Sequence, residues 1–370
     1  MALTLHGTVS DNTVALDRKT ATPLIINGDM AIDQRNSGAS LTITGNDVSC
    51  DRWKFQVSQA SKLTSEQNDS SGLANFNNYM RITTASAYTP ATDEFFIVKQ
   101  NIEGQNMTFL NFGSSDAQAI TLGFYVRSSL TGTFGGAVYN QAGNRNHPFS
   151  YTISSANTWE FKTVNISGDT TGTWQKDNAI GMTLLFSLGA NATRLNTAGT
   201  WTATYSTGAT GQVNMIETGS ATWDVTGVQL EVGTFDANSI PPFQFEDRAT
   251  SLARCMRYYE RNQGTGSNRE YFSVGIKRDS YSGSDATVSG IMTYKVRKRA
   301  TPTIGYNGAT SFVYTHGVSS ENNFSSINIQ NIGLDHARFQ GEIGSSTANS
   351  GGIIARREET DRYYDIDSEL

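Results

Sequence analysis

Two runs that lie far apart in the sequence decide the fold of this chain. They are Ile26-Asn27-Gly28-Asp29-Met30-Ala31-Ile32-Asp33-Gln34-Arg35 and Val225-Thr226-Gly227-Val228-Gln229-Leu230-Glu231-Val232-Gly233, the second followed by Pro241-Pro242-Phe243. The sequence between them alternates short apolar segments with polar loops. A β-sandwich has such an opening and closing pair when its first and last strands lie side by side. We therefore predict one domain whose edge strands are these two runs, and a binding module rather than a catalyst.

Composition supports an all-β protein. The chain has 370 residues, of which 37% are hydrophobic, 17% charged and 10% aromatic, and it contains 35 glycines. Such a mixture suits many short strands with tight turns and uncharged polar solvent faces. The length predicts two or three domains. The net charge of −6 disfavours nucleic acid as the main partner.

The two cysteines, Cys50 and Cys255, are too few and too far apart for a disulfide framework or a metal pattern. Free thiols favour assembly in a reducing cytoplasm. The N-terminal residues do not resemble a signal peptide, and no run approaches the roughly 18 apolar residues that span a bilayer. We therefore expect no membrane insertion and assembly without a signal peptide, with virus assembly and host lysis as one route out of a cell.

The larger part of the chain is predicted to be a jelly-roll β-sandwich over residues 25–245. Its strands are expected where apolar and polar residues alternate, over 120–127, 134–139, 159–166, 181–188 and 223–230. Before it, residues 1–24 are expected to form an arm that docks to a particle or packs on the next domain, the alternative being a loose tail.

A helix and a second domain are predicted after the sandwich. Ala249, Leu252, Ala253, Met256 and Tyr259 form one apolar stripe at helical spacing, so residues 246–267 are assigned to a connecting helix over 246–261 and a linker. The stripe suits a lid on its own domain or the seam of a coiled-coil trimer. Residues 268–370 return to strand patterns and predict a small C-terminal β domain.

Signals for catalysis are weak. The four histidines, His6, His147, His316 and His336, belong to no metal or catalytic motif, and no nucleophile elbow, phosphate loop or dinucleotide fingerprint is present. His147 is placed in a polar loop with a structural role. Glycosidases need two placed carboxylates, which one sequence cannot pair, and no β-helix repeat indicates a depolymerase. We expect no enzyme activity.

Aromatic residues in polar loops give the better hypothesis. Sugars bind through aromatic faces, with amides and charged groups holding the hydroxyls. Trp174 and Trp201 are predicted sugar platforms. Tyr139, Asn140 and Arg145 are further candidates, because they place aromatic, amide and charged groups in other polar segments. The alternative is that both tryptophans cap the core edge. Trp53, Trp159 and Trp223 are assigned to the core. A basic cluster at Lys295, Arg297, Lys298 and Arg299 is interpreted as the solvent face of a strand end, the alternative being a site for phosphate or acidic sugar.

Six short elements, taken in order, resemble carbohydrate-binding-module-like jelly rolls of bacteriophage tail proteins and the parts that follow them. The elements are Asn27 to Arg35; Asp51-Arg52-Trp53; Val228-Gln229-Leu230-Glu231-Val232-Gly233 with Phe243 and Phe245; Leu252-Ala253-Arg254-Cys255-Met256-Arg257-Tyr258-Tyr259; Arg299-Ala300-Thr301-Pro302-Thr303; and Ser368-Glu369-Leu370.

This resemblance implies a virion adhesin, such as a tail fibre or related appendage, that forms a homotrimer and binds host surface polysaccharide without catalysis. The N-terminal arm would then contact other virion proteins. Such modules often hold a structural calcium ion, but this chain has Thr226 and Gly227 where acidic residues are typical, so the ion stays open and no other cofactor is expected. Two other functions remain open: a structural particle component without a ligand, such as a head decoration or tail adaptor, and a polysaccharide depolymerase.

Overall fold

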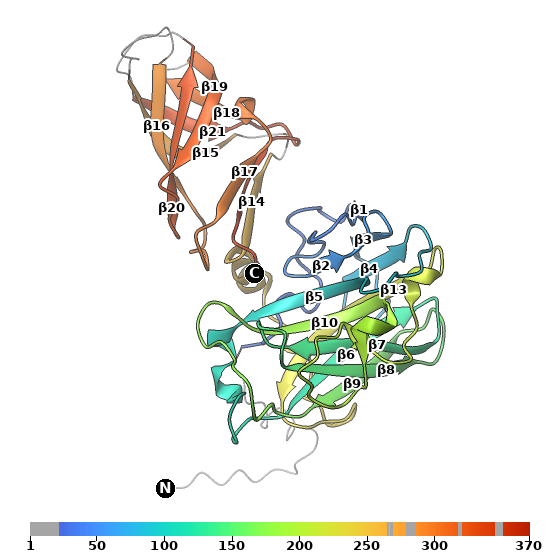
Figure 1. Cartoon of the computed structure of the whole chain (residues 1–370). Coiled ribbons are helices and arrows are strands. Elements are labelled where there is room, and N and C mark those ends of the chain that lie inside the picture. Colours follow the sequence, from blue (N-terminus) through green and yellow to red (C-terminus); the bar gives the residue numbers. More distant parts are fainter. Residues whose placement is uncertain (1–21, 265, 267–268, 279–285, 317–319, 345–350) are drawn as a thin grey trace, which may run out of the picture. The chain divides into compact units, whose positions relative to one another are not determined.

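The structure is a computed structural model that describes residues 22–264, 266, 269–278, 286–316, 320–344 and 351–370 (Figure 1). Most of the predicted arm, residues 1–24, lies outside the described residues, so its docking stays a prediction. The chain divides into two compact units, Met1–Ser251 and Leu252–Leu370. No helix within the described part of the chain is long and apolar enough to cross a membrane.

The larger unit is a sandwich of two antiparallel sheets. One sheet has the order β1 (Leu41–Thr42), β3 (Leu63–Asn68), β4 (Tyr79–Thr84), β13 (Thr222–Val232), β6 (Ile120–Ser128) and β9 (Glu160–Ile166). The other has the order β2 (Lys54–Val57), β5 (Phe95–Glu103), β10 (Ile180–Ala190), β7 (Gly132–Tyr139) and β8 (Asn146–Ile153). Because the chain crosses repeatedly between the sheets, the unit has jelly-roll architecture, and the predicted all-β class is confirmed (Figure 1).

Short elements connect these strands. They are the strands β11 (Leu195–Asn196) and β12 (Gly208–Ala209) and the 3-10 turns η1 (Gly104–Asn106), η2 (Thr108–Leu110), η3 (Ala192–Arg194) and η4 (Met215–Glu217). The predicted strands all appear, with ends that differ by a few residues.

The core of the sandwich follows the predicted alternation. Ile120, Leu122, Phe124 and Val126 of β6 point inward and are fully buried. Trp53 and Trp223 are also fully buried. The core assignment of Trp159 is wrong, because this residue is only half-buried, and its indole N–H donates to the carbonyl oxygen of Ser71 at 2.7 Å.

The two framing runs meet in one body, as predicted, but neither forms an edge strand. The closing run is β13, which lies between β4 and β6, and the opening run is irregular backbone. The Val228 N–H donates to the Gly28 carbonyl oxygen at 2.9 Å. On the other sheet, the side-chain amide of Gln100 accepts from the Ile26 N–H at 2.8 Å and donates to the Ile26 carbonyl at 2.9 Å. The opening run therefore joins both sheets.

Asn27 fixes the turn at this junction. Its φ of 57° is left-handed, a conformation that Asn tolerates better than most residues. Its side chain donates to the carbonyls of Ile32 and Asp51 and accepts from the Ile32 N–H. The indole N–H of Trp53 donates to the Asn27 carbonyl at 3.0 Å. The turn is thus held by buried hydrogen bonds rather than by strand pairing.

The smaller unit contains a three-stranded sheet and a closed barrel. The sheet has the order β14 (Tyr259–Gln263), β22 (Tyr363–Asp367) and β17 (Thr303–Tyr306). The barrel has the order β15 (Glu270–Arg278), β16 (Ala286–Thr293), β20 (His336–Ile343), β19 (Ser320–Gln330), β18 (Phe312–His316) and β21 (Gly351–Arg356), and the turn η5 (Ala309–Ser311) precedes β18.

The connecting helix is shorter than predicted. Helix α2 runs over Arg248–Met256, with the Asp247 carboxylate accepting from the backbone N–H groups of Ala249 and Thr250 at its start. Tyr259 does not belong to the helical stripe, because it opens β14 and pairs with Asp367 of β22. Strand pairing therefore overrides the helical spacing at this end.

The basic cluster is only partly on the surface. Lys298 is buried, and its ammonium lies 2.7 Å from Oε2 of Glu260 and 2.6 Å from the Met256 carbonyl. The assignment of Lys298 to a solvent face is therefore wrong, since the charge is neutralised internally, whereas Lys295 and Arg297 are exposed.

Gly28→Ala is expected to destabilise the larger unit. A Cβ at this position would lie 2.1 Å from the Val228 carbonyl oxygen, a backbone atom that cannot move independently. We expect a loss of about 3 kcal/mol in the free energy of unfolding. Denaturant unfolding followed by tryptophan fluorescence measures this unit alone, because all five tryptophans belong to it.

Gly45→Ala is the matched control, because a Cβ there meets no atom within 4 Å. It should change stability by less than about 0.5 kcal/mol. Equal effects of the two substitutions would contradict the proposed junction.

Candidate functional site

Four of the five predicted sugar-binding residues meet in one cluster around Asp169. Nε of Arg145 donates to the Asp169 carboxylate at 2.8 Å, and the indole N–H of Trp174 donates to it at 3.0 Å. The Trp201 ring lies 5.5 Å from that of Trp174. The amide of Asn140 donates to the Thr173 carbonyl at 3.0 Å. The structure thus brings together residues that the sequence analysis named as separate candidates.

Trp174 and Asn140 are buried in this cluster, which contradicts their use as a binding surface. Trp174 is 6% exposed and packs edge-to-face against Phe112 and Trp201. Asn140 is fully buried. The Trp174 platform and the Asn140 contact are therefore wrong as stated, because neighbouring side chains occupy the ring and the amide. Trp201 is half-buried, and its indole N–H donates to the Ser167 carbonyl. It packs against the core, as the alternative interpretation has it.

Electrostatics explain why this cluster is stable. Burial raises the pKa of Asp169, but hydrogen bonds from Arg145 and Trp174 outweigh burial and bring its pKa below the ordinary value. The hydrogen bond to Asp169 raises the pKa of Arg145. The cluster is thus a charge-assisted hydrogen-bond network that closes one part of the core.

Tyr139 lies elsewhere. It ends β7, is 8% exposed, and packs with Ile97, Leu185 and the ring of Tyr205 on the outer side of the five-stranded sheet. Burial raises the pKa of its hydroxyl. It contributes to a small hydrophobic cluster rather than to the network around Asp169.

Trp174→Ala should therefore affect folding strongly. Removal of a buried indole leaves a cavity and takes one hydrogen bond from the Asp169 carboxylate, so we expect a loss of about 3–5 kcal/mol in the free energy of unfolding. Phe245→Ala is the control, because this aromatic residue is 52% exposed, and it should cost less than about 1 kcal/mol. Unchanged stability of the Trp174 variant would restore the platform interpretation.

His147 predicts a pH dependence of stability. It lies in β8 rather than in a loop, and burial lowers its pKa below 6.5. Because the unfolded chain then binds the proton more tightly, stability that is present above about pH 6.5 is lost as the pH falls towards the folded pKa. We expect His147→Gln to flatten the fall in the free energy of unfolding between about pH 7 and pH 5. His336→Gln, at an exposed position of the smaller unit, should leave the fall unchanged.

An aromatic groove that the sequence analysis missed lies on the outer face of the six-stranded sheet. Its pocket has a volume of about 270 Å³ and contains five aromatic rings, those of Phe76, Tyr125, Phe161, Phe243 and Phe245. Consecutive rings lie close together, with centroids 4.8 Å apart for Tyr125 and Phe161 and 5.1 Å apart for Phe76 and Phe245. We call this feature the aromatic groove.

Strand alternation and a bulge build the aromatic groove. Tyr125 is an outward residue of β6 and lies opposite Phe161 of β9. The register between β13 and β6 shifts between Thr226 and Gln229, and Gly227 within this bulge has a φ of +63°. A Cβ at Gly227 would lie 2.8 Å from the Phe76 ring, so glycine lets that ring approach the sheet.

One polar side chain in the aromatic groove has an unused acceptor. Gln229 is 6% exposed, and its Nε2 donates to the Pro241 carbonyl at 3.1 Å. Its Oε1 is buried and accepts no hydrogen bond from the residues that the structure describes. None of the described residues lining the groove is charged, and Asn75 adds an exposed amide. The groove therefore combines ring faces with neutral polar groups.

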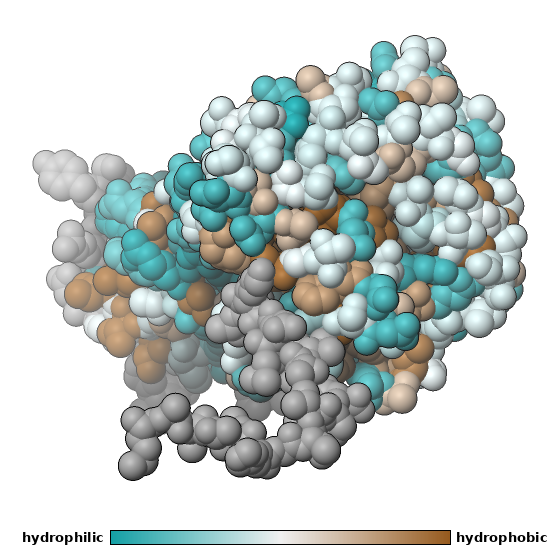
Figure 2. Space-filling model, turned by 90° about the horizontal axis from the view of Figure 1, so that it is seen from below, coloured by the Kyte–Doolittle hydropathy of each residue, from teal (hydrophilic) through white to brown (hydrophobic). Residues whose placement is uncertain are grey.

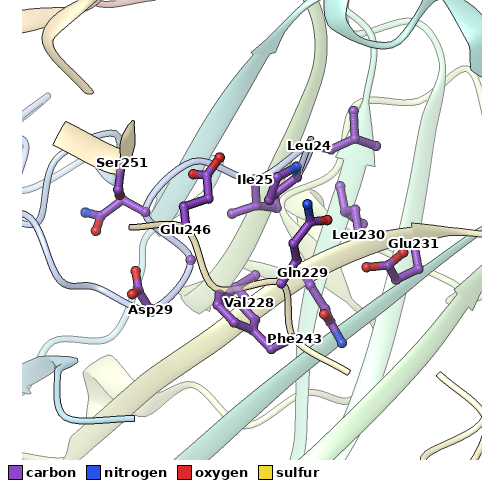
Figure 3. Close-up of a pocket in the computed structure, with 14 residues that line it drawn as sticks. Leu24, Ile25, Asp29, Val228, Gln229, Leu230, Glu231, Phe243, Glu246 and Ser251 are labelled. Atoms are coloured by element: carbon purple, nitrogen blue, oxygen red, sulfur yellow. The ribbon is translucent and has the colours of Figure 1, made fainter. Parts of the chain in front are cut away.

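A second pocket lies between the opening run and β13 (Figure 3). Its volume of about 20 Å³ fits roughly one water molecule rather than a sugar. Figure 3 shows Asp29 and Glu246 on one side and Glu231 on the other. Burial raises the pKa of Asp29, and the charge of Glu246 adds to the effect. Across the described ranges, no three His, Cys, Asp or Glu side chains are placed to hold a metal ion together. The structural calcium site that the resemblance leaves open stays a hypothesis.

Comparisons with solved structures return carbohydrate-binding modules and a phage protein. The tailspike protein 4 enzymatically active domain of bacteriophage CBA120 is 12% identical, and the match covers 57% of this chain and 21% of that chain with a TM-score of 0.28. TmCBM61 in complex with β-1,4-galactotriose is 8% identical over 57% of this chain and 99% of that chain, with a TM-score of 0.29.

A family 11 carbohydrate-binding module from Clostridium thermocellum, in complex with a β-1,3-1,4-mixed-linked tetrasaccharide, is 15% identical. The match covers 50% of this chain and 91% of that chain, with a TM-score of 0.25. No protein-family model and no curated protein matches the chain.

Proposed function

We propose that the larger unit binds a carbohydrate in the aromatic groove, without catalysis, and that the chain is a virion appendage attaching to host surface glycans. The observation that carries the binding proposal is the five-ring lining of the aromatic groove. Aromatic faces stack on the apolar C–H surfaces of sugars. The virion assignment rests on the sequence resemblance alone.

The size and chemistry of the groove favour a short stretch of neutral glycan. A volume of about 270 Å³ is near the lower end of ligand pockets, which span roughly 300–1,000 Å³. No carboxylate lines the groove in the part of the chain that the structure describes, whereas glycoside hydrolysis needs two. These features support binding over hydrolysis. A single site of this size binds weakly, so attachment would gain from several copies in one particle, by about 10²–10⁴ in avidity.

The test is a glycan array carrying neutral oligosaccharides and bacterial surface oligosaccharides, probed with the full-length chain. Phe245→Ala and Tyr125→Ala should each weaken binding by about tenfold or more, because each removes one stacking face. Phe109→Ala is the matched control, because Phe109 is an exposed aromatic residue (41%) in η2, outside the groove. Its binding should equal that of the wild type.

Two outcomes would replace the proposal. Incorporation into particles with no glycan or cell binding would favour a structural component, such as a head decoration or tail adaptor. Shortened polysaccharide after incubation would establish a depolymerase. Binding that persists in both groove variants would place the site elsewhere on the unit.

A further inference from the structure

The aromatic groove continues into a further pocket on the loop between β3 and β4. This pocket has a volume of about 350 Å³ and is lined by nine consecutive residues, 69–77. We call it the loop pocket. Asn75 and Phe76 line both the loop pocket and the aromatic groove. The two cavities are therefore contiguous, and a ligand that fills the aromatic groove reaches the loop pocket if it is long enough.

The lining of the loop pocket is polar where that of the aromatic groove is aromatic. Phe76 is its one ring, and its exposed polar groups are the carboxylate of Asp69, the hydroxyl of Ser70 and the amides of Asn75 and Asn77. Each amide can both donate to and accept from a hydroxyl group. Figure 2 shows that the molecular surface is mixed in the same way, with hydrophobic residues gathered in separate patches among polar and neutral ones.

Ser71 fixes the shape of the loop from inside. This residue is buried, and its hydroxyl donates to the Phe76 carbonyl and accepts from the Leu73 N–H at 3.0 Å. Its own N–H donates to the Asn77 carbonyl at 3.1 Å. These bonds hold the segment that carries Asn75 and Asn77 against the residue that supplies the shared ring. The spacing between the amides and the ring is therefore set by the protein alone.

Trp159 anchors the same loop to the six-stranded sheet. Its indole N–H donates to the Ser71 carbonyl at 2.7 Å. Its ring packs edge-to-face against Tyr79 with centroids 5.6 Å apart, and the Arg127 guanidinium lies 4.6 Å from its centroid. Arg127 is itself held, because its Nε donates to the buried Asp224 carboxylate at 2.8 Å. The loop is thus pre-organised, and a pre-organised surface binds without the cost of ordering it.

We propose that the loop pocket is a hydrogen-bonding subsite of the glycan site, in which Asn75 and Asn77 hold the sugar unit that follows the one stacked in the aromatic groove. This inference rests on the proposed function, because the groove must bind a sugar for its neighbour to reach the loop. A few precisely placed polar groups fix the orientation of a ligand and give specificity. The ligand is therefore an oligosaccharide that spans both pockets, and the loop distinguishes such chains by their hydroxyl pattern.

The experiment measures the affinity of the full-length chain for neutral oligosaccharides of the glycan array, ordered by length from one to six sugar units. Wild-type affinity should rise by about tenfold or more from the short to the long members of a series that binds. Asn77→Ala should remove most of this rise and leave affinity for the short members unchanged, because Asn77 lines the loop pocket and not the aromatic groove.

Asn106→Ala is the matched control. Asn106 is an exposed asparagine in η1 and lines neither pocket, so this variant should keep the full rise with chain length. The backbone carbonyl of Asn77, which accepts from Ser71, is retained in the alanine variant. Its midpoint of thermal unfolding should therefore equal that of the wild type.

The possible outcomes separate this inference from the proposed function. Affinity that does not depend on chain length would overturn the subsite while leaving binding in the aromatic groove intact. So would an Asn77→Ala variant that keeps the full rise, or one that weakens short and long oligosaccharides equally. Failure of the wild type to bind any neutral oligosaccharide would overturn the proposed binding function, and the subsite with it.

Discussion

The close approach of Gly28 to Val228 is the constraint on which the larger unit depends. Only a residue without a Cβ lets the opening run reach the backbone of β13, where the Val228 N–H meets the Gly28 carbonyl. The bulge that surrounds Val228 also contains Gly227, whose left-handed backbone lets Phe76 pack against the sheet from the outside. One irregularity in β13 therefore closes the sandwich on its inner side and forms the floor of the aromatic groove on its outer side.

The network around Asp169 shows how sequence context can mislead about aromatic residues. Trp174 stands among polar residues, which is the pattern expected of a loop that faces solvent. In the structure these polar residues satisfy the buried groups of the same cluster, with Asp169 accepting from both Arg145 and Trp174. A buried charge-assisted network requires polar neighbours as much as a binding site does. The pattern therefore could not distinguish the two roles.

The aromatic groove differs in its chemistry from the network around Asp169. Its lining combines five rings with neutral polar side chains and no charged residue among the described ones, so it suits a ligand that presents apolar C–H faces. The network around Asp169 uses its charged and polar groups internally, since Asp169 accepts from Arg145 and Trp174. Ring faces that border a pocket are available to a ligand, whereas polar groups paired within the protein are not.

The sequence by itself determined the all-β class, the strands of the sandwich, the buried positions of Trp53 and Trp223, and the meeting of the two framing runs. The strands and the buried tryptophans follow from local alternation, which fixes the side of the sheet on which each residue lies. The meeting of the framing runs follows from the expected fold class, because the first and last segments of a β-sandwich lie side by side. Only the tertiary structure decided that β13 is a central strand, that Tyr259 leaves the helix, and that Lys298 is buried beside Glu260. The aromatic groove, too, could be recognised only from the tertiary structure. Alternation places Tyr125 outside, but its meeting with Phe76 and Phe245 depends on contacts between segments far apart in the sequence, which local patterns do not encode.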